Sequence, residues 1–88
     1  MTASTPDPQQ IRGRLLALLT AIAPDIDPAA IDDVAELRDQ FDFDSMDRLH
    51  FMTAISEAFK IDIPEPDYPQ LAALGAACRY VAQRLAAI

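Results

Sequence analysis

The chain has 88 residues, of which 51% are hydrophobic, so it suits one small domain with a single modest core. Its net charge of −7 disfavours nucleic acid and anionic membrane surfaces as partners and favours basic proteins. Its one cysteine excludes an internal disulfide and a cysteine-based zinc site.

Alanine and leucine are abundant, glycine occurs only twice, and no stretch alternates Val, Ile and Thr as a strand would. We therefore expect an all-α fold, a four-helix bundle with a long first loop and a short third helix. Residues 1–6 are expected to form a disordered tail and residues 7–88 a single domain. No signal peptide, membrane span or lipidation motif is evident, so we expect a cytoplasmic monomer that does not insert into membranes.

The first helix is predicted to begin after Asp7. Asp7 suits an N-cap, Pro8 suits the first helical position, and Gln10 completes a capping box. Pro24 ends the helix. Its apolar stripe is Ile11, Leu15, Leu18, Leu19 and Ile22.

Residues 25–44 contain seven aspartates and one glutamate among scattered apolar residues. They predict a long ordered loop with a helical turn after Asp27-Pro28. A loop of about twenty residues in a compact domain is more often functional than accidental. Its predicted apolar anchors are Ile26, Ile31, Val34, Leu37 and Phe41.

The second helix is predicted to begin at Asp44 or Ser45, with Asp44 as its cap and Asp47 in the first turn, where a negative charge is favourable. Its predicted core residues are Phe51, Met52, Ile55 and Phe59.

Ile63-Pro64 closes the turn after the second helix. Pro66 and Pro69 leave room for only a short third helix between them, because Tyr68 precedes a proline and is pushed out of helical geometry. The last helix has the most regular spacing, with predicted core residues Leu71, Leu74, Cys78, Val81, Leu85 and Ile88.

Ser45 is the principal candidate site. A serine in the first turn of a helix presents its hydroxyl to solvent, beside backbone N–H groups that favour a phosphate. The plain alternative is an ordinary capping serine. Catalysis by the chain itself needs a base, but the only histidine, His50, lies about 140° around the helix from Ser45. We therefore expect no enzyme, but a serine that another enzyme modifies.

A calcium site is a second possibility, because aspartates gather around the start of the second helix. An EF-hand loop would need an oxygen ligand in place of Met46, glycine in place of Asp47 and glutamate in place of Thr53. We therefore expect a solvated acidic face and no metal. The aspartates around the start of the second helix are Asp39, Asp42, Asp44 and Asp47.

Cys78 is expected to be a buried, inert thiol.

The segment Phe43-Asp44-Ser45-Met46-Asp47 resembles the Asp-Ser-Leu motif of acyl carrier proteins, in which the serine carries 4′-phosphopantetheine. From Asp44 onward the sequence follows the family pattern without a gap, and the first helix and the long loop also fit, so that the resemblance covers about residues 8–87. Beyond the motif it rests on Ala54, Glu57, Phe59, Ile63-Pro64, Ala76-Ala77, Tyr80 and Val81.

This resemblance implies that a phosphopantetheinyl transferase, which supplies magnesium and the base, attaches the cofactor to Ser45 within the Asp44–Met46 motif. It implies that the thiol of the arm then holds an acyl group as a thioester for loading, transfer or synthase enzymes with basic docking patches. The implied partner surface is Asp44, Met46, Asp47, Leu49, His50, Thr53 and Glu57, with Arg48 nearby. The residues expected to line an acyl-chain cavity are Phe51, Ile55, Phe59, Leu71 and Leu74.

The chain also departs from the family. Asp42-Phe43 stands where many members have a glycine before the motif, and the two prolines interrupt the typical acidic third helix. We therefore expect dedicated partner enzymes and a short or unusual acyl group. Three positions lack the glutamates common in the family, and these are His50, Ser56 and Ala58.

The preferred interpretation is an acyl carrier protein of lipid or secondary-metabolite biosynthesis. One alternative is a peptidyl or aminoacyl carrier of non-ribosomal peptide or polyketide assembly, although that class commonly has a glycine before the residue that precedes the modified serine. The alternative of another class is an acidic helical adaptor without a prosthetic group. A small metal-binding helical protein is disfavoured by the failed EF-hand spacing.

Overall fold

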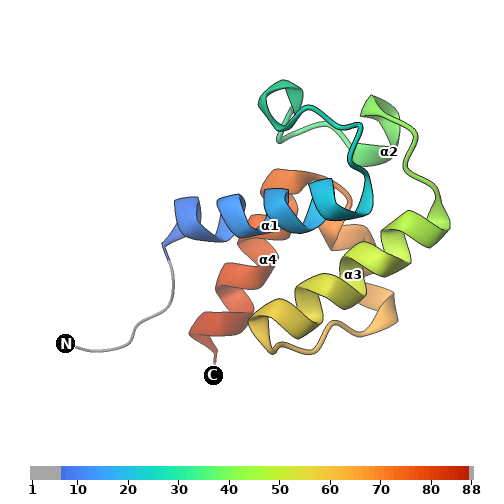
Figure 1. Cartoon of the computed structure of the whole chain (residues 1–88). Helices are drawn as coiled ribbons and strands as arrows, with labels where there is room; N and C mark the ends of the chain where they lie inside the picture. Colours follow the sequence, from blue (N-terminus) through green and yellow to red (C-terminus); the bar gives the residue numbers. More distant parts are fainter. Residues whose placement is uncertain (1–6, 88) are drawn as a thin grey trace.

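The structure, a computed structural model, describes residues 7–87. The expected tail at residues 1–6 and the expected core residue Ile88 lie outside this range. Between residues 7 and 87 the chain is helical and has no β-strand, which confirms the all-α prediction (Figure 1). In chain order the elements are α1 (Pro8–Ile22), the 3₁₀ turn η1 (Pro28–Ala30), α2 (Leu37–Gln40), α3 (Ser45–Phe59), the 3₁₀ helix η2 (Glu65–Leu71) and α4 (Leu74–Ala86).

The start of α1 matches the prediction. The Gln10 backbone N–H donates to the Asp7 carboxylate (2.9 Å), and the Asp7 backbone N–H donates to the Gln10 side-chain oxygen (3.0 Å). This capping box satisfies donors that a helix start leaves free. Farther along α1, Arg14 donates to the Ala58 carbonyl at 2.8 Å and stacks over the Phe59 ring at 4.3 Å. Both contacts join α1 to the end of α3.

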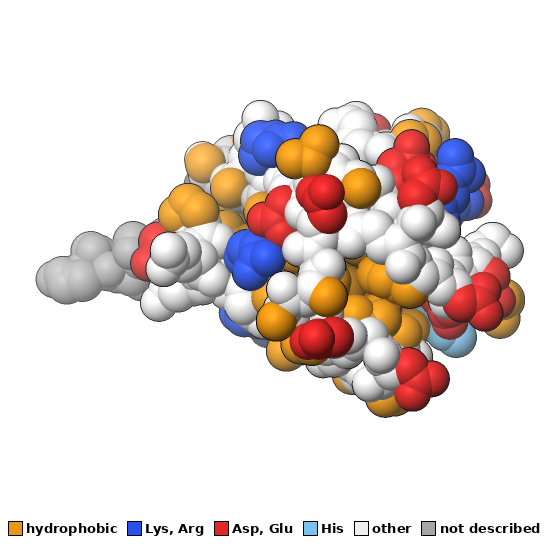
Figure 2. All heavy atoms as spheres, turned by 90° about the horizontal axis from the view of Figure 1, so that it is seen from above, with side chains coloured by type: hydrophobic (Ala, Val, Ile, Leu, Met, Phe, Trp, Pro, Cys, Tyr) orange, Lys and Arg blue, Asp and Glu red, His pale blue; other side chains and the backbone are white. Residues whose placement is uncertain are grey.

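The long loop is ordered by α2, which the sequence did not predict, and by contacts to the bundle. Arg12 pairs with both carboxylate oxygens of Asp33 (2.9 and 2.8 Å), and the Asp33 carbonyl accepts from the Gly75 N–H (2.9 Å). The Leu37 N–H donates to the Ala72 carbonyl (2.9 Å). Figure 2 shows acidic side chains spread over the face formed by this loop and α1, with basic side chains between them.

One predicted loop anchor is wrong. Val34 is 88% exposed, whereas Leu37 is buried and Ile26, Ile31 and Phe41 are half-buried. The Asp32 carboxylate accepts from the Val34 backbone N–H at 2.8 Å. This aspartate turn redirects the chain, so that Val34 points into solvent.

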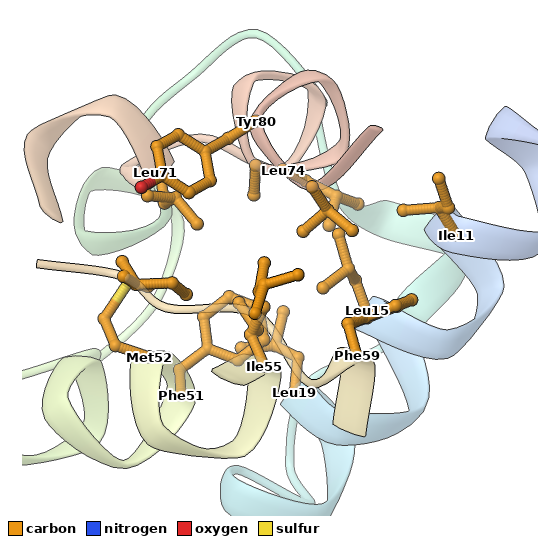
Figure 3. Close-up of a cluster of buried hydrophobic side chains, with 14 of the residues drawn as sticks. Ile11, Leu15, Leu19, Phe51, Met52, Ile55, Phe59, Leu71, Leu74 and Tyr80 are labelled. Atoms are coloured by element: carbon orange, nitrogen blue, oxygen red, sulfur yellow. The ribbon is translucent and has the colours of Figure 1, made fainter. Parts of the chain in front are cut away.

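The core lies between the three long helices, with α1 packed against both α3 and α4 (Figure 3). The four residues predicted for the second helix are all buried, and so are Ile11, Leu15 and Leu19 of α1. The remaining members of the core are Leu37, Ile61, Ile63, Leu71, Leu74, Ala77, Tyr80 and Val81.

The third and fourth helices differ from the prediction. The helix η2 continues through Pro69 to Leu71, so Leu71 ends η2 and is not the start of the last helix. A proline lacks the backbone N–H and its ring crowds the carbonyl four residues earlier, but a short 3₁₀ segment has no i→i−4 hydrogen bonds to lose and tolerates it. Cys78 is only half-buried, contrary to the expectation. Tyr80, which was not among the predicted core residues of this helix, is buried with 5% exposure.

Candidate functional site

Ser45 is the first residue of α3, as the sequence predicted. Asp44 caps the helix, because its carboxylate accepts from the Asp47 backbone N–H at 2.9 Å. The Ser45 side chain is exposed, and its hydroxyl has no hydrogen-bond partner among residues 7–87. The cap function therefore belongs to Asp44, and the Ser45 hydroxyl is free for other chemistry.

Phe43 holds the loop against α3 immediately before this serine. Its ring meets Phe51 of the core edge-on, at 6.1 Å between centroids, and meets Phe41 edge-on at 5.7 Å. Aromatic pairs in this geometry add stability beyond the area that they bury. The aromatic residue at this position thus anchors the loop that leads into the helix.

A pocket of about 190 Å³ opens beside Ser45. Leu71 and Ala72 line it opposite the start of α3, and two arginines, Arg38 and Arg48, contribute to its wall. Arg38 also pairs with Glu36 (Nε to Oε1, 3.0 Å). The sequence did not predict this pocket, because α2 and the end of η2 are brought to Ser45 only by the fold. Its lining residues are Glu36, Arg38, Phe43, Asp44, Ser45, Arg48, Leu71 and Ala72.

Comparison with known proteins identifies the family. The family model described as a phosphopantetheine attachment site matches residues 14–81, which is most of the chain. The chain belongs to the acyl carrier protein family. It is also 29% identical, over 84 residues, to a protein named acyl carrier protein from Streptomyces coelicolor (strain ATCC BAA-471 / A3(2) / M145). That alignment covers 96% of this chain and 91% of the relative.

Family membership makes this protein a carrier with a covalently attached 4′-phosphopantetheine. The surroundings of Ser45 fit such a group. An exposed, unpartnered hydroxyl is accessible to a transferase, the first turn of a helix favours a phosphate, and Arg48 supplies a positive charge one turn away. The Ser45 hydroxyl is therefore a suitable acceptor for 4′-phosphopantetheine.

The residues predicted to meet partner enzymes lie on the exposed side of α3. Met46 and Leu49 are large apolar side chains with exposures of 59% and 46%. Asp47 is half-buried, and the other predicted members are exposed: Asp44, Arg48, His50, Thr53 and Glu57. His50 makes no hydrogen bond to Ser45 in the described part of the chain.

The residues predicted to line an acyl-chain cavity are brought together, but as packed core. Phe51, Ile55 and Leu74 are 0% exposed, Leu71 is 1% exposed and Phe59 is 6% exposed. Figure 3 shows these side chains pointing into the same interior. Only Leu71 also lines the pocket beside Ser45. Leu71 therefore separates that pocket from the core.

The sequence also raised the questions of a metal site, a membrane-spanning segment and a reactive cysteine. Within residues 7–87, no three His, Cys, Asp or Glu side chains are grouped so that they could hold a metal ion. Over the same residues, no helix has the length and apolar character required to cross a membrane. Burial raises the pKa of the Cys78 thiol above its usual value, which disfavours the reactive thiolate.

Proposed function

We propose that Ser45 is the residue that bears 4′-phosphopantetheine and that this carrier presents an acyl group to partner enzymes in lipid or secondary-metabolite biosynthesis. The observation that carries this proposal is the exposed Ser45 hydroxyl at the first turn of α3, without a partner among the described residues and inside the matched segment 14–81. When bound, the group supplies a thiol that holds the acyl chain as a thioester.

In the attachment reaction the Ser45 oxygen attacks the phosphate of coenzyme A that bears the pantetheine. A new phosphoester bond forms at Ser45, the pyrophosphate bond of coenzyme A breaks, and the adenosine bisphosphate leaves. The serine proton passes to a base, which we assign to the transferase together with the magnesium ion. The carrier is then the substrate of this step and not its catalyst.

The test is incubation with coenzyme A, Mg²⁺ and a promiscuous phosphopantetheinyl transferase, followed by intact mass measurement. We expect one phosphopantetheine per chain on the wild type and none on Ser45→Ala. The matched control is Ser56→Ala, because Ser56 lies on the same helix but donates to the Ile61 carbonyl at 2.6 Å. Ser56→Ala should gain the full mass. An unmodified wild type would favour the acidic adaptor instead.

We assign partner recognition to the exposed side of α3 and expect dedicated enzymes with basic docking patches. Exposed charges at an interface rim mainly set the association rate and the choice of partner. Glu57 is exposed, so Glu57→Lys should slow association with such an enzyme without unfolding the protein. Equal turnover by general fatty acid synthesis enzymes and by dedicated ones would contradict this assignment.

We further propose a short or unusual acyl group, held toward the space around Phe51, Ile55 and Leu74. These side chains fill that space, so a long chain has to displace packed residues. Equal thermal stabilisation by short and long attached acyl chains would contradict the proposal. So would amide shift changes at these residues that do not depend on chain length. The similarity to a protein named acyl carrier protein supports an acyl over an aminoacyl cargo.

A further inference from the structure

Two large hydrophobic side chains are exposed immediately after Ser45. Met46 is the next residue of the chain and is 59% exposed, and Leu49 is 46% exposed. Residues three positions apart are neighbours on a helix surface, so these two side chains form one apolar patch at the start of α3. Neither of them belongs to the buried core. The patch is therefore available for contact with another protein.

Met46 differs from Leu49 in its chemistry, because a thioether sulfur can be oxidised. A lone pair of the sulfur attacks one oxygen of hydrogen peroxide, an S–O bond forms, the O–O bond breaks, and the second oxygen leaves as water. The sulfur is oxidised by two electrons and the peroxide is reduced by two. The product, methionine sulfoxide, is polar, and methionine sulfoxide reductases convert it back to the thioether.

The structure provides a buried methionine on the same helix for comparison. Met52 is 1% exposed and lies among the core side chains (Figure 3). A peroxide reaches Met52 only when the fold opens, whereas it reaches Met46 in the folded protein. Cys78 is half-buried, and burial raises the pKa of its thiol, so that little of the reactive thiolate is present. Among residues 7–87, Met46 is therefore the sulfur most open to oxidation.

An enzyme that acts on Ser45 has to cover Met46 as well. Consecutive Cα atoms are about 3.8 Å apart across a trans peptide bond, and residues 7–87 contain no cis bond. A transferase that encloses the Ser45 hydroxyl therefore removes part of the Met46 side chain from water. A thioether is apolar and adapts to such a contact. A sulfoxide loses hydrogen bonds to water there, which disfavours the complex.

Resting on the proposed attachment at Ser45, we infer that Met46 is a reversible oxidation site whose state controls the loading of the carrier. In the thioether form, the patch of Met46 and Leu49 makes an apolar contact with the transferase. In the sulfoxide form this contact is weakened, and transfer of phosphopantetheine to Ser45 slows. The loaded fraction of the carrier then falls in the presence of peroxide and recovers when the sulfoxide is reduced.

The first measurement is oxidation of the folded, full chain by hydrogen peroxide, followed by peptide mapping. We expect Met46 to gain oxygen at least about tenfold faster than Met52, because Met52 reacts only through opening of the fold. In concentrated urea the two methionines should react at similar rates. Equal rates in the folded protein would overturn the selectivity for Met46. The mapping also separates these residues from Met1, which lies outside the described residues.

The second measurement is the initial rate of phosphopantetheine transfer, followed by intact mass, for each protein before and after peroxide treatment. In the wild type the rate should fall about tenfold, the order expected when a polar group is buried without a partner. Sulfoxide reductases should restore it. Treated and untreated Met46→Leu should be modified at the same rate, because leucine is close to methionine in volume and has no sulfur. The matched control Met52→Leu should respond to peroxide as the wild type does.

The outcomes separate this inference from the proposed function. A wild type that is fully oxidised at Met46 but is modified at its untreated rate would overturn the inference and leave Ser45 as the attachment site. An equal fall in Met46→Leu would assign the effect to another residue and also overturn it. Urea unfolding of the oxidised wild type should show an unchanged midpoint, and a lower midpoint would contradict the inference by assigning the slower transfer to unfolding. Absence of any mass gain on the untreated wild type would overturn both proposals together.

Discussion

The Tyr80 hydroxyl donates a hydrogen bond of 2.6 Å to the Asp67 carboxylate, which ties η2 to α4. Arg84 donates to the same carboxylate oxygen at 2.8 Å and lies over the Tyr80 ring at 5.0 Å. These contacts hold η2, including Leu71 at its end, against α4. Leu71 is a core residue that also lines the pocket beside Ser45, so this network helps to fix one wall of that pocket.

Tyr80→Phe should lower the free energy of unfolding by about 1–2 kcal/mol, because it removes a hydrogen bond to a charged group and leaves the ring in place. Urea unfolding at neutral pH measures the change. The control is Tyr68→Phe, since the Tyr68 hydroxyl donates no hydrogen bond within residues 7–87. An equal loss in the two variants would show that the Asp67 bond contributes nothing of its own.

The same tyrosine predicts a dependence of stability on alkaline pH. Burial, followed by the hydrogen bond to Asp67, raises the pKa of Tyr80 above its ordinary value. The folded state therefore holds this proton more tightly than the unfolded state. The resulting stabilisation is fully present below about pH 10, the ordinary tyrosine pKa, and is lost as the pH rises through the folded pKa.

Urea unfolding between about pH 9 and pH 11 tests this dependence. The wild type should lose stability more steeply than Tyr80→Phe over this range, so the difference between them should shrink. Parallel slopes in the two proteins would contradict the raised pKa of Tyr80.

Helix starts and buried helix faces could be predicted from the sequence where interactions between nearby residues determine them. Asp7 with Gln10, and Asp44 with Asp47, form the caps that the sequence indicated. The periodic apolar residues of α3 are buried as expected. These features depend on residues three or four positions apart, so tertiary packing did not need to be known.

The sequence did not predict the position of a side chain correctly where a residue far away in the chain or a local turn determines it. Val34 is apolar, but an aspartate turn points it outward. Tyr80 is buried, and its hydroxyl donates a hydrogen bond to Asp67 in another element. Ser45 was identifiable from its motif, whereas Arg38 reaches its pocket only because α2 forms in the long loop. Such contacts between segments leave no periodic pattern in the sequence.

The two glycines predict different effects of substitution by alanine. A Cβ at Gly13 of α1 meets nothing within 4 Å, so Gly13→Ala should raise the free energy of unfolding by about 0.5–1 kcal/mol. A Cβ at Gly75 would lie 3.0 Å from the Asp33 carbonyl oxygen, which accepts from the Gly75 N–H. This crowding should cancel the helical gain, so Gly75→Ala should be no more stable than the wild type. Similar gains in both variants, measured by urea unfolding, would contradict the close approach at Gly75.

Asp44 caps α3, and we expect it also to take part in recognition by the transferase; two substitutions can separate these roles. Asn is as good an N-cap as Asp, so Asp44→Asn should unfold within about 0.5 kcal/mol of the wild type, whereas Asp44→Ala should lose about 1 kcal/mol. Because the carboxylate is exposed beside Ser45, removal of its charge should slow modification by the transferase about threefold to tenfold in both variants.

The control for the charge is Asp42→Asn, an exposed aspartate shortly before the motif that accepts no hydrogen bond within residues 7–87. Its stability and its rate of modification should stay close to those of the wild type. Initial rates from intact mass and urea unfolding on the same samples measure both effects. If Asp44→Asn were modified at the wild-type rate, the role of Asp44 would be that of a helix cap alone.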